Sequence, residues 1–200
     1  RITESRGVAR NGVATFGFPF PEGVVKDVAQ IRAGRPVQAR PLARWRDGSV
    51  RWALLDVPAS VTAHGTDELR VRWDGVGAVP EPKQRVTVKE DHDEVILHTG
   101  VTKVTIRRGD TRWLAIEANG RWLDGPDEHV WVAAGKIGED GKVSAQVSPR
   151  LLFMRAPTVV KVIDRGPLRA RVQVEGAIVD PIERTSIRYR GRVDAYAGSP

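Results

Sequence analysis

The chain has 200 residues, of which 40% are hydrophobic and 28% charged, a composition typical of a soluble globular protein. It contains no cysteine, which excludes disulfides, thiolate metal ligands and thiol catalysis, and no apolar run approaches the roughly 18 residues of a membrane span. The net charge of +7 either keeps the surface solvated or favours a polyanionic partner, such as nucleic acid, anionic lipid or acidic polysaccharide.

The first predicted hairpin is centred on Asp47-Gly48. Apolar and polar residues alternate over 37–45 and again over 50–54, a pattern typical of half-buried strands. The Asp-Gly pair suits a turn in which glycine adopts a positive φ. The phase of the alternation predicts that Trp45 and Trp52 both face the core.

Further alternating segments follow along the chain, and no window of about 11 residues keeps a helical stripe. Asn119-Gly120 marks the strongest turn, because this dipeptide accepts the positive φ values of a type I′ hairpin. Near the end, apolar residues at alternate positions predict a strand pair over 168–174 and 187–195. Other strands are expected at residues 69–73, 86–88 and 101–106. The architecture should be nearly all β.

The polar stretch 81–94, which holds the acidic run 90–94, predicts a domain boundary near residue 90. The expected domains are therefore 1–90 and 91–200. A second irregular region, 135–149, is expected to be a loop or loose hairpin inside the second domain.

Several segments together resemble one known family over nearly the whole chain. They are GFPFPEG at 17–23, RWRDGSVRWALLD at 44–56, HTG at 98–100, GPLRA at 166–170, and Tyr189-Arg190 leading into DAYAGSP at 194–200. These segments resemble the N-terminal domain of the exo-rhamnogalacturonan lyase-like proteins, a group that includes YetA-like bacterial proteins.

The resemblance implies an all-β fold: a small RIFT-type β-barrel, then an antiparallel β-sandwich that is incomplete at its C-terminal end. In the family a large α/α toroid follows, which this chain does not contain. The family's proteins look like bacterial polysaccharide lyases or relatives of unknown specificity, and they are often exported. We therefore expect an extracellular or periplasmic location, with any export signal removed from the chain or left out of it. No catalytic residue is carried over, and the chain by itself is expected not to turn over substrate.

Five arginines form the candidate substrate-binding site. They alternate with apolar residues in the last predicted strand pair, so each set lies on one face of its strand, about 7 Å apart at ~3.3 Å rise per residue. A cationic face of this kind suits the carboxylates of uronic acids. The alternative is the solvated outer face of a sandwich. The five residues are Arg169, Arg171, Arg188, Arg190 and Arg192.

Tryptophans are the other candidate sugar contacts, because exposed indoles stack on flat apolar surfaces. Trp45, Trp52 and Trp73 share the phase of apolar strand neighbours and are expected in the core. The positions of Trp113, Trp122 and Trp131 are left open between core packing and an exposed rim.

No metal or cofactor site is expected. His64, His92, His98 and His129 are dispersed without ligand spacing, and the acidic run 90–94 is better explained by solubility than by calcium binding. No phosphate loop or nucleophile elbow occurs. Four carboxylates remain as candidate acids or bases: Glu22, Asp27, Asp47, which its turn explains, and Asp56, which a strand end explains.

The sequence thus predicts a non-catalytic β portion of a polysaccharide lyase-like protein that acts on or binds acidic polysaccharide. An alternative is a structural or assembly protein whose strand edges pair into a homo-oligomer or filament. Nucleic-acid binding ranks last, since only the net charge supports it and no basic helix or RNA-reading motif is present. A membrane partner is not expected.

Overall fold

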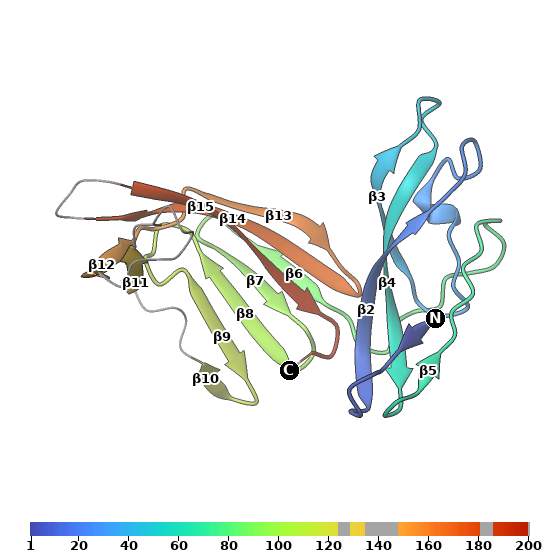
Figure 1. Cartoon of the computed structure of the whole chain (residues 1–200), viewed down its shortest axis with the longest axis horizontal. Helices are drawn as coiled ribbons and strands as arrows, with labels where there is room; N and C mark the ends of the chain where they lie inside the picture. The colour runs from blue at the N-terminus through green and yellow to red at the C-terminus, as the bar shows by residue number, and fades with distance from the viewer. Residues whose placement is uncertain (124–128, 135–147, 181–185, 200) are drawn as a thin grey trace, which may run out of the picture.

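The computed structural model describes residues 1–123, 129–134, 148–180 and 186–199 (Figure 1). In these residues the regular structure is β-strand except for one short 3₁₀ helix, which confirms the all-β prediction. The strands form two units. The N-terminal unit contains β1 (Ile2–Thr3), β2 (Arg10–Pro19), η1 (Val28–Gln30), β3 (Gln38–Arg44), β4 (Val50–Val61) and β5 (Thr66–Asp67).

The N-terminal unit is built on an antiparallel sheet of order β2-β4-β3, and β1 pairs separately with β5. The predicted turn between β3 and β4 is confirmed: Trp45 N–H donates to the Ser49 carbonyl at 2.8 Å, and Gly48 has φ 84°. The Asp47 side chain accepts both the Ser49 N–H and the Ser49 hydroxyl, which holds the pKa of Asp47 below its usual value.

The phase predicted for β4 is wrong after Val50, which is itself completely buried in the core. Ala53, Leu55 and Val57 are completely buried, whereas Trp52 is 41% exposed on the opposite face. The local sequence is apolar on both sides of the strand here, so alternation alone does not decide which side becomes the core. In the N-terminal unit, the side of β4 that carries Ala53 and Leu55 forms the core, where these residues pack with Phe20 and Val25.

The core assignment of the other tryptophans is corrected in part. Trp45 is only half-buried, and its indole N–H donates to the Phe20 carbonyl at 3.0 Å. Trp73 remains 37% exposed, with its ring edge-on to Phe20 at 5.7 Å between centroids. The strand predicted over 69–73 does not form, and Arg72 makes only an isolated bridge to Arg32.

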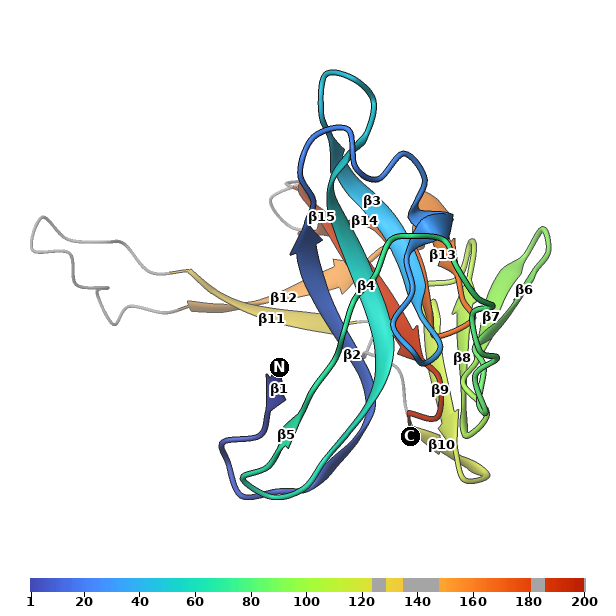
Figure 2. The same ribbon diagram turned by 90° about the vertical axis from the view of Figure 1, so that its right-hand side faces the viewer.

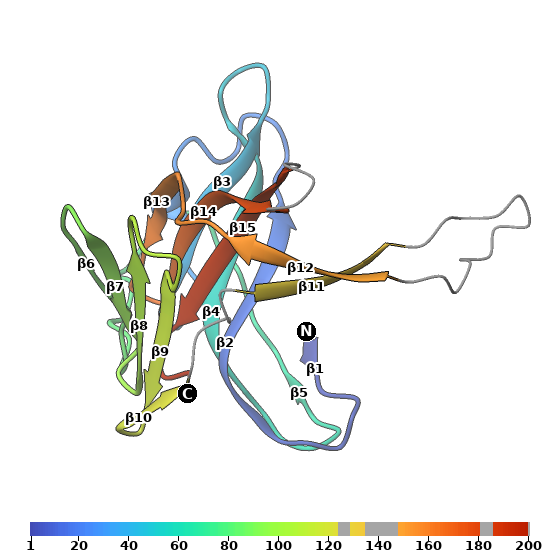
Figure 3. The ribbon, with the colours of Figure 1, turned by 90° about the vertical axis from the view of Figure 1, so that its left-hand side faces the viewer.

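The C-terminal unit consists of two packed sheets (Figure 3). One is an antiparallel meander of order β10-β9-β8-β7-β6; the other has the order β11-β12-β14-β13, with β15 also paired to β14. Its strands are β6 (Thr87–Glu90), β7 (Glu94–His98), β8 (Thr102–Arg107), β9 (Leu114–Ala118), β10 (Arg121–Leu123), β11 (His129–Ala134), β12 (Ser148–Met154), β13 (Val159–Arg165), β14 (Arg169–Val179) and β15 (Ser186–Tyr196).

The two sheets of this unit enclose one apolar core, to which the meander contributes Leu97 and Ile106 and strand β14 contributes Val172 and Val174. Trp113 belongs to this core, whereas Trp122 is 57% exposed; the side chain of Trp131 lies outside the described part. The predicted Asn119-Gly120 hairpin is confirmed, since both residues have positive φ (51° and 71°) and Ala118 pairs with Arg121.

The change from one unit to the other comes before residue 90. Strand β6 pairs with β7, and Val86 already lies in the second core and donates its N–H to the Pro167 carbonyl at 2.7 Å. The acidic run forms the β6–β7 turn, where the Asp91 carboxylate accepts two backbone N–H groups. Most of the irregular region 135–149 lies outside the described residues, and β12 begins within its end.

Glu90, at the β6–β7 turn, connects the two sheets of the C-terminal unit through its ion pairs. Its carboxylate accepts hydrogen bonds from Arg108, directly after β8, and from Arg165 of β13. These two guanidinium groups lower the pKa of Glu90 below its usual value. A carboxyl group with a lowered folded-state pKa stabilises the fold above its unfolded-state pKa, and this contribution is lost as the pH falls through the folded-state value.

We therefore expect Glu90→Gln to lower the free energy of unfolding at neutral pH, by about 1 kcal/mol or less because the group is partly solvated. In strong acid, once the native carboxyl has become protonated, this deficit should shrink towards zero. Urea titrations at both pH values measure this. A deficit of the same size at both would contradict the ion-pair explanation.

Candidate functional site

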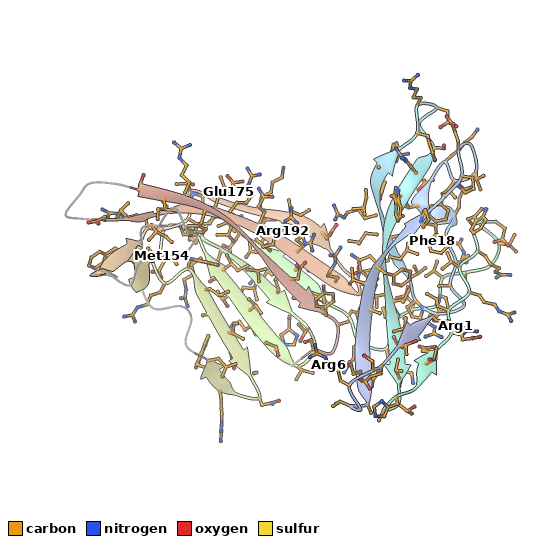
Figure 4. The ribbon with its side chains drawn as sticks, viewed as in Figure 1. Arg1, Arg6, Phe18, Met154, Glu175 and Arg192 are labelled. Atoms are coloured by element: carbon orange, nitrogen blue, oxygen red, sulfur yellow. The ribbon has the colours of Figure 1, made fainter. Side chains whose placement is uncertain are left out.

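The outer face of β14 and β15 carries the predicted site. The register pairs Arg171 with Asp194, Gln173 with Arg192 and Glu175 with Arg190, so these side chains all lie on one face. The opposite face, with Ala170, Val172 and Val174, packs in the core. Figure 4 labels Glu175 and Arg192 on the side of this sheet that faces away from the β6–β10 sheet.

Three of the five predicted arginines form an exposed row along β15, which we call the arginine row: Arg188, Arg190 and Arg192. Arg190 is paired with Glu175 at 2.7 Å, but its side chain remains 67% exposed. No ion pair of Arg188 or Arg192 is found within the residues described. Lys161 of β13 lies on the same face, opposite Gln173, and is also exposed.

Arg171 is held by a bidentate ion pair. Its Nε and Nη2 lie 2.6 and 3.0 Å from the two carboxylate oxygens of Asp194 on the neighbouring strand. This pairing raises the pKa of Arg171, and the side chain is only 16% exposed. Arg171 is therefore less available to a ligand than the arginine row.

Arg169 lies where the two units meet, with 0% of its surface exposed. Its Nη2 donates to Asp164 of β13 at 3.0 Å, and its Nε lies 3.3 Å from Asp56 of β4. Its Nη1 faces Asp194 at 3.7 Å. The arrangement compensates a buried guanidinium with three carboxylates drawn from both units.

Further groups complete this cluster. The Gln38 side chain of β3 accepts the backbone N–H of Leu168 and of Arg169 and donates to the Arg169 carbonyl, all within 2.9 Å. Arg40 of the same strand lies 3.5 Å from Asp164. Within the described part of the chain, Nε and Nη1 of Arg169 and Nε of Arg40 face carboxylates without a hydrogen bond of good geometry.

Asp56 is the member of the cluster that the sequence explained incorrectly. It was expected at a strand end, but it lies in the middle of β4 and is 1% exposed. Burial raises the pKa of Asp56, although the Thr15 hydroxyl at 2.5 Å and the Arg169 guanidinium both act to lower it. Leu55 and Val57 point to the other side of β4, so alternation alone indicated a solvent-facing Asp56; the available signal of its burial was that Leu54 and Pro58, its neighbours on the same side, are apolar.

The position of Asp164 depends on an irregularity in β13. The register with β14 shifts between Val162, which pairs with Val172, and Asp164, which pairs with Arg171. The β-bulge places the Asp164 side chain on the outer face, toward Arg169. Alternation in the sequence would have placed Asp164 on the same side as Val162.

The structure thus brings the five predicted arginines to one face but divides them between exposed, paired and buried positions. Tyr189, between two arginines of the row, packs against the core on the other face, and burial raises its pKa. Among the other candidates, Asp27 caps η1 by accepting the Ala29 N–H, while Glu22 is exposed. The described residues contain no cluster of three or more histidine or acidic side chains arranged for a metal.

The fold and its sequence define a class of protein. Residues 2–74 match the family model described as the PcRGLX-like N-terminal RIFT barrel domain, so the N-terminal unit is a domain of this kind, as the resemblance predicted. The chain is also similar to the Bacillus subtilis (strain 168) protein named "Uncharacterized protein YetA", with 25% identity over 178 residues.

The similarity to YetA covers 82% of this chain and so extends beyond the barrel into the C-terminal unit. The chain corresponds to 19% of the length of that relative. Within the described ranges, no helix is long and apolar enough to cross a membrane.

Proposed function

We propose that this chain is a non-catalytic, polysaccharide-binding part of a larger lyase-like protein, and that it binds acidic, uronic-acid-containing polymers through the arginine row. The observation that carries the proposal is the exposure of three arginines at alternate positions on one strand face. Arginine recognises carboxylates through a planar fork of donors, and a spacing of about 7 Å between alternate residues suits a repeating anionic polymer.

The remaining contacts of the site support binding without turnover. Arg169 joins the two units and is closed to solvent, so we assign it to the scaffold. Tyr189, the residue of this segment suited to proton transfer, faces the core, away from the arginine row. Uronide elimination needs a positioned base and acid in addition to a cation. Export of the protein, which the family resemblance implies, would bring this face to extracellular polymers.

The binding proposal predicts that Arg188→Glu, Arg190→Glu and Arg192→Glu together weaken binding to polygalacturonate by at least about tenfold, since attraction becomes repulsion at three contacts. Isothermal titration calorimetry at low and high salt measures the loss, which should shrink as salt screens the charges. The matched control changes Arg46, Arg70 and Arg121 to glutamate. It alters the net charge equally at exposed positions outside this face.

Equal binding by the row variant and the control variant would contradict the proposal, because net charge would then explain the interaction. Incubation of the chain with polygalacturonate should produce no ultraviolet absorbance from unsaturated uronide. Appearance of that absorbance would show that the chain is catalytic.

Assembly through strand edges is the second candidate function. Strand β15 is a long edge strand in the described sheet, paired to β14 along its length. Its arginines would oppose pairing with a second copy, because like charges would lie close together. Light scattering on a gel-filtration column should show a monomer at all concentrations; a size that grows with concentration would favour assembly.

A further inference from the structure

An exposed tryptophan lies on the N-terminal unit, on the sheet face that meets the arginine-bearing sheet. Trp52 and Asp56 share one side of β4, because alternate residues of a strand point the same way. The Trp52 ring lies over Gly17 of the adjacent strand β2: a Cβ at that glycine would be 3.5 Å from the indole Cε3. The ring therefore lies across β2 and keeps 41% of the residue's surface exposed.

Trp52 and the arginine row extend from a common junction. The ion pair of Asp56 and Arg169 joins the two sheets, and Trp52 is four residues from Asp56, about 13 Å along β4 at ~3.3 Å per residue. Arg192 is four residues from Tyr196, the partner of Arg169 on β15, and so lies about 13 Å along the other sheet. Figure 1 shows the beginning of β14 beside the β2-β4-β3 sheet, and Figure 2, turned by 90°, shows this sheet in front of β13 and β14.

A side-chain contact joins the two faces at the junction. Arg40 of β3, which pairs with Leu54 of β4 between Asp56 and Trp52, reaches Asp164 on the outer face of β13. A ligand that lies on the arginine row and extends toward the N-terminal unit therefore meets Arg40 and Leu54 before Trp52. One face supplies exposed cations and the other supplies an aromatic ring.

We infer that Trp52 is a sugar-stacking residue for the same acidic polysaccharide, which crosses from the arginine row onto the N-terminal unit. This inference rests on the function proposed above. A uronic-acid chain has both kinds of group that the surface requires: carboxylates for the arginines and flat, partly apolar ring faces for the indole. The barrel domain would then take part in ligand binding instead of only supporting the second unit.

The test compares Trp52→Ala with Trp122→Ala. Trp122 is more exposed than Trp52, but it lies on β10, in the sheet of the C-terminal unit that does not carry the arginine row. Trp52→Ala should weaken binding of polygalacturonate about two- to tenfold in titration calorimetry, and Trp122→Ala should bind as the parent does. Stacking is not screened by salt, so the loss from Trp52→Ala should persist at an ionic strength that reduces the effect of the arginine row.

The outcomes separate this inference from the proposed function. If the row variant loses binding while Trp52→Ala binds as the parent does, the stacking role is overturned and the proposed function stands. If the parent chain does not bind polygalacturonate, both fall. Trp52→Phe keeps a ring and should retain more affinity than Trp52→Ala; equal losses in both variants would also contradict stacking. Thermal melting of each variant checks that the fold is intact.

Discussion

Replacement of Arg169 by methionine is expected to lower the free energy of unfolding by about 3–5 kcal/mol, the cost of leaving buried carboxylates without their cation. In the native chain this guanidinium faces Asp56 and Asp164, which are 1% and 9% exposed. Methionine fills most of the space of the arginine side chain but carries no charge. Both carboxylates would therefore stay buried without a compensating cation. Urea-induced unfolding followed by circular dichroism measures the loss.

The effect of Arg169→Met should depend on pH in a defined direction. Burial already raises the pKa of Asp56, and removal of the guanidinium should raise it further. A raised folded-state pKa gives stability that is complete below the unfolded-state pKa and is lost as the pH rises through the folded-state value. The deficit of the variant should therefore shrink in acid.

Arg190→Met is the control. The Arg190 side chain, which pairs with Glu175, is 67% exposed, so we expect this variant to lose about 1 kcal/mol or less. A similar loss in both variants would show that the buried cluster has no special role.

Truncation of Leu97 to alanine should cost about 2–5 kcal/mol, because it opens a cavity in the core of the C-terminal unit. Leu97 is completely buried between the two sheets, where Ile106 and Val172 are also completely buried. Leu123→Ala is the matched control. This leucine lies on β10 of the same sheet but is 54% exposed, so its truncation should change the free energy of unfolding by no more than about 0.5 kcal/mol. Equal losses in urea titrations of the two variants would contradict the assignment of Leu97 to the core.

Turns and strand positions were the most predictable features of this chain, because they depend on residues that are close in sequence. Asp47-Gly48 and Asn119-Gly120 both form the expected turns, and each glycine has the positive φ that its residue type allows. The alternation over 168–174 likewise predicted which side of β14 is buried. The apolar run at 53–55 has no such asymmetry, so its phase could not be read locally.

The sequence predicted that the five candidate arginines share one face, but not how far each of them is exposed. Five arginines at alternate positions correctly indicated a shared face, because a strand repeats every two residues. Whether each arginine is exposed depends on which carboxylate reaches it. Arg169 and Arg188 carry the same side chain on the same sheet face, yet one is buried against Asp56 and the other is exposed.

The sequence by itself determined the β architecture, the turns and the row of cations along β15, since alternation and turn chemistry act over a few residues. Only the tertiary structure decided the burial of Arg169 and Asp56 and the exposure of Trp52. The exposure of Trp52 depends on which side of β4 packs in the core of the N-terminal unit. The burial of Arg169 and Asp56 depends on contact between strands more than 100 residues apart, such as Gln38 of β3 with Arg169 of β14. The partner that compensates or covers a side chain in such a contact comes from a segment whose position no local pattern encodes.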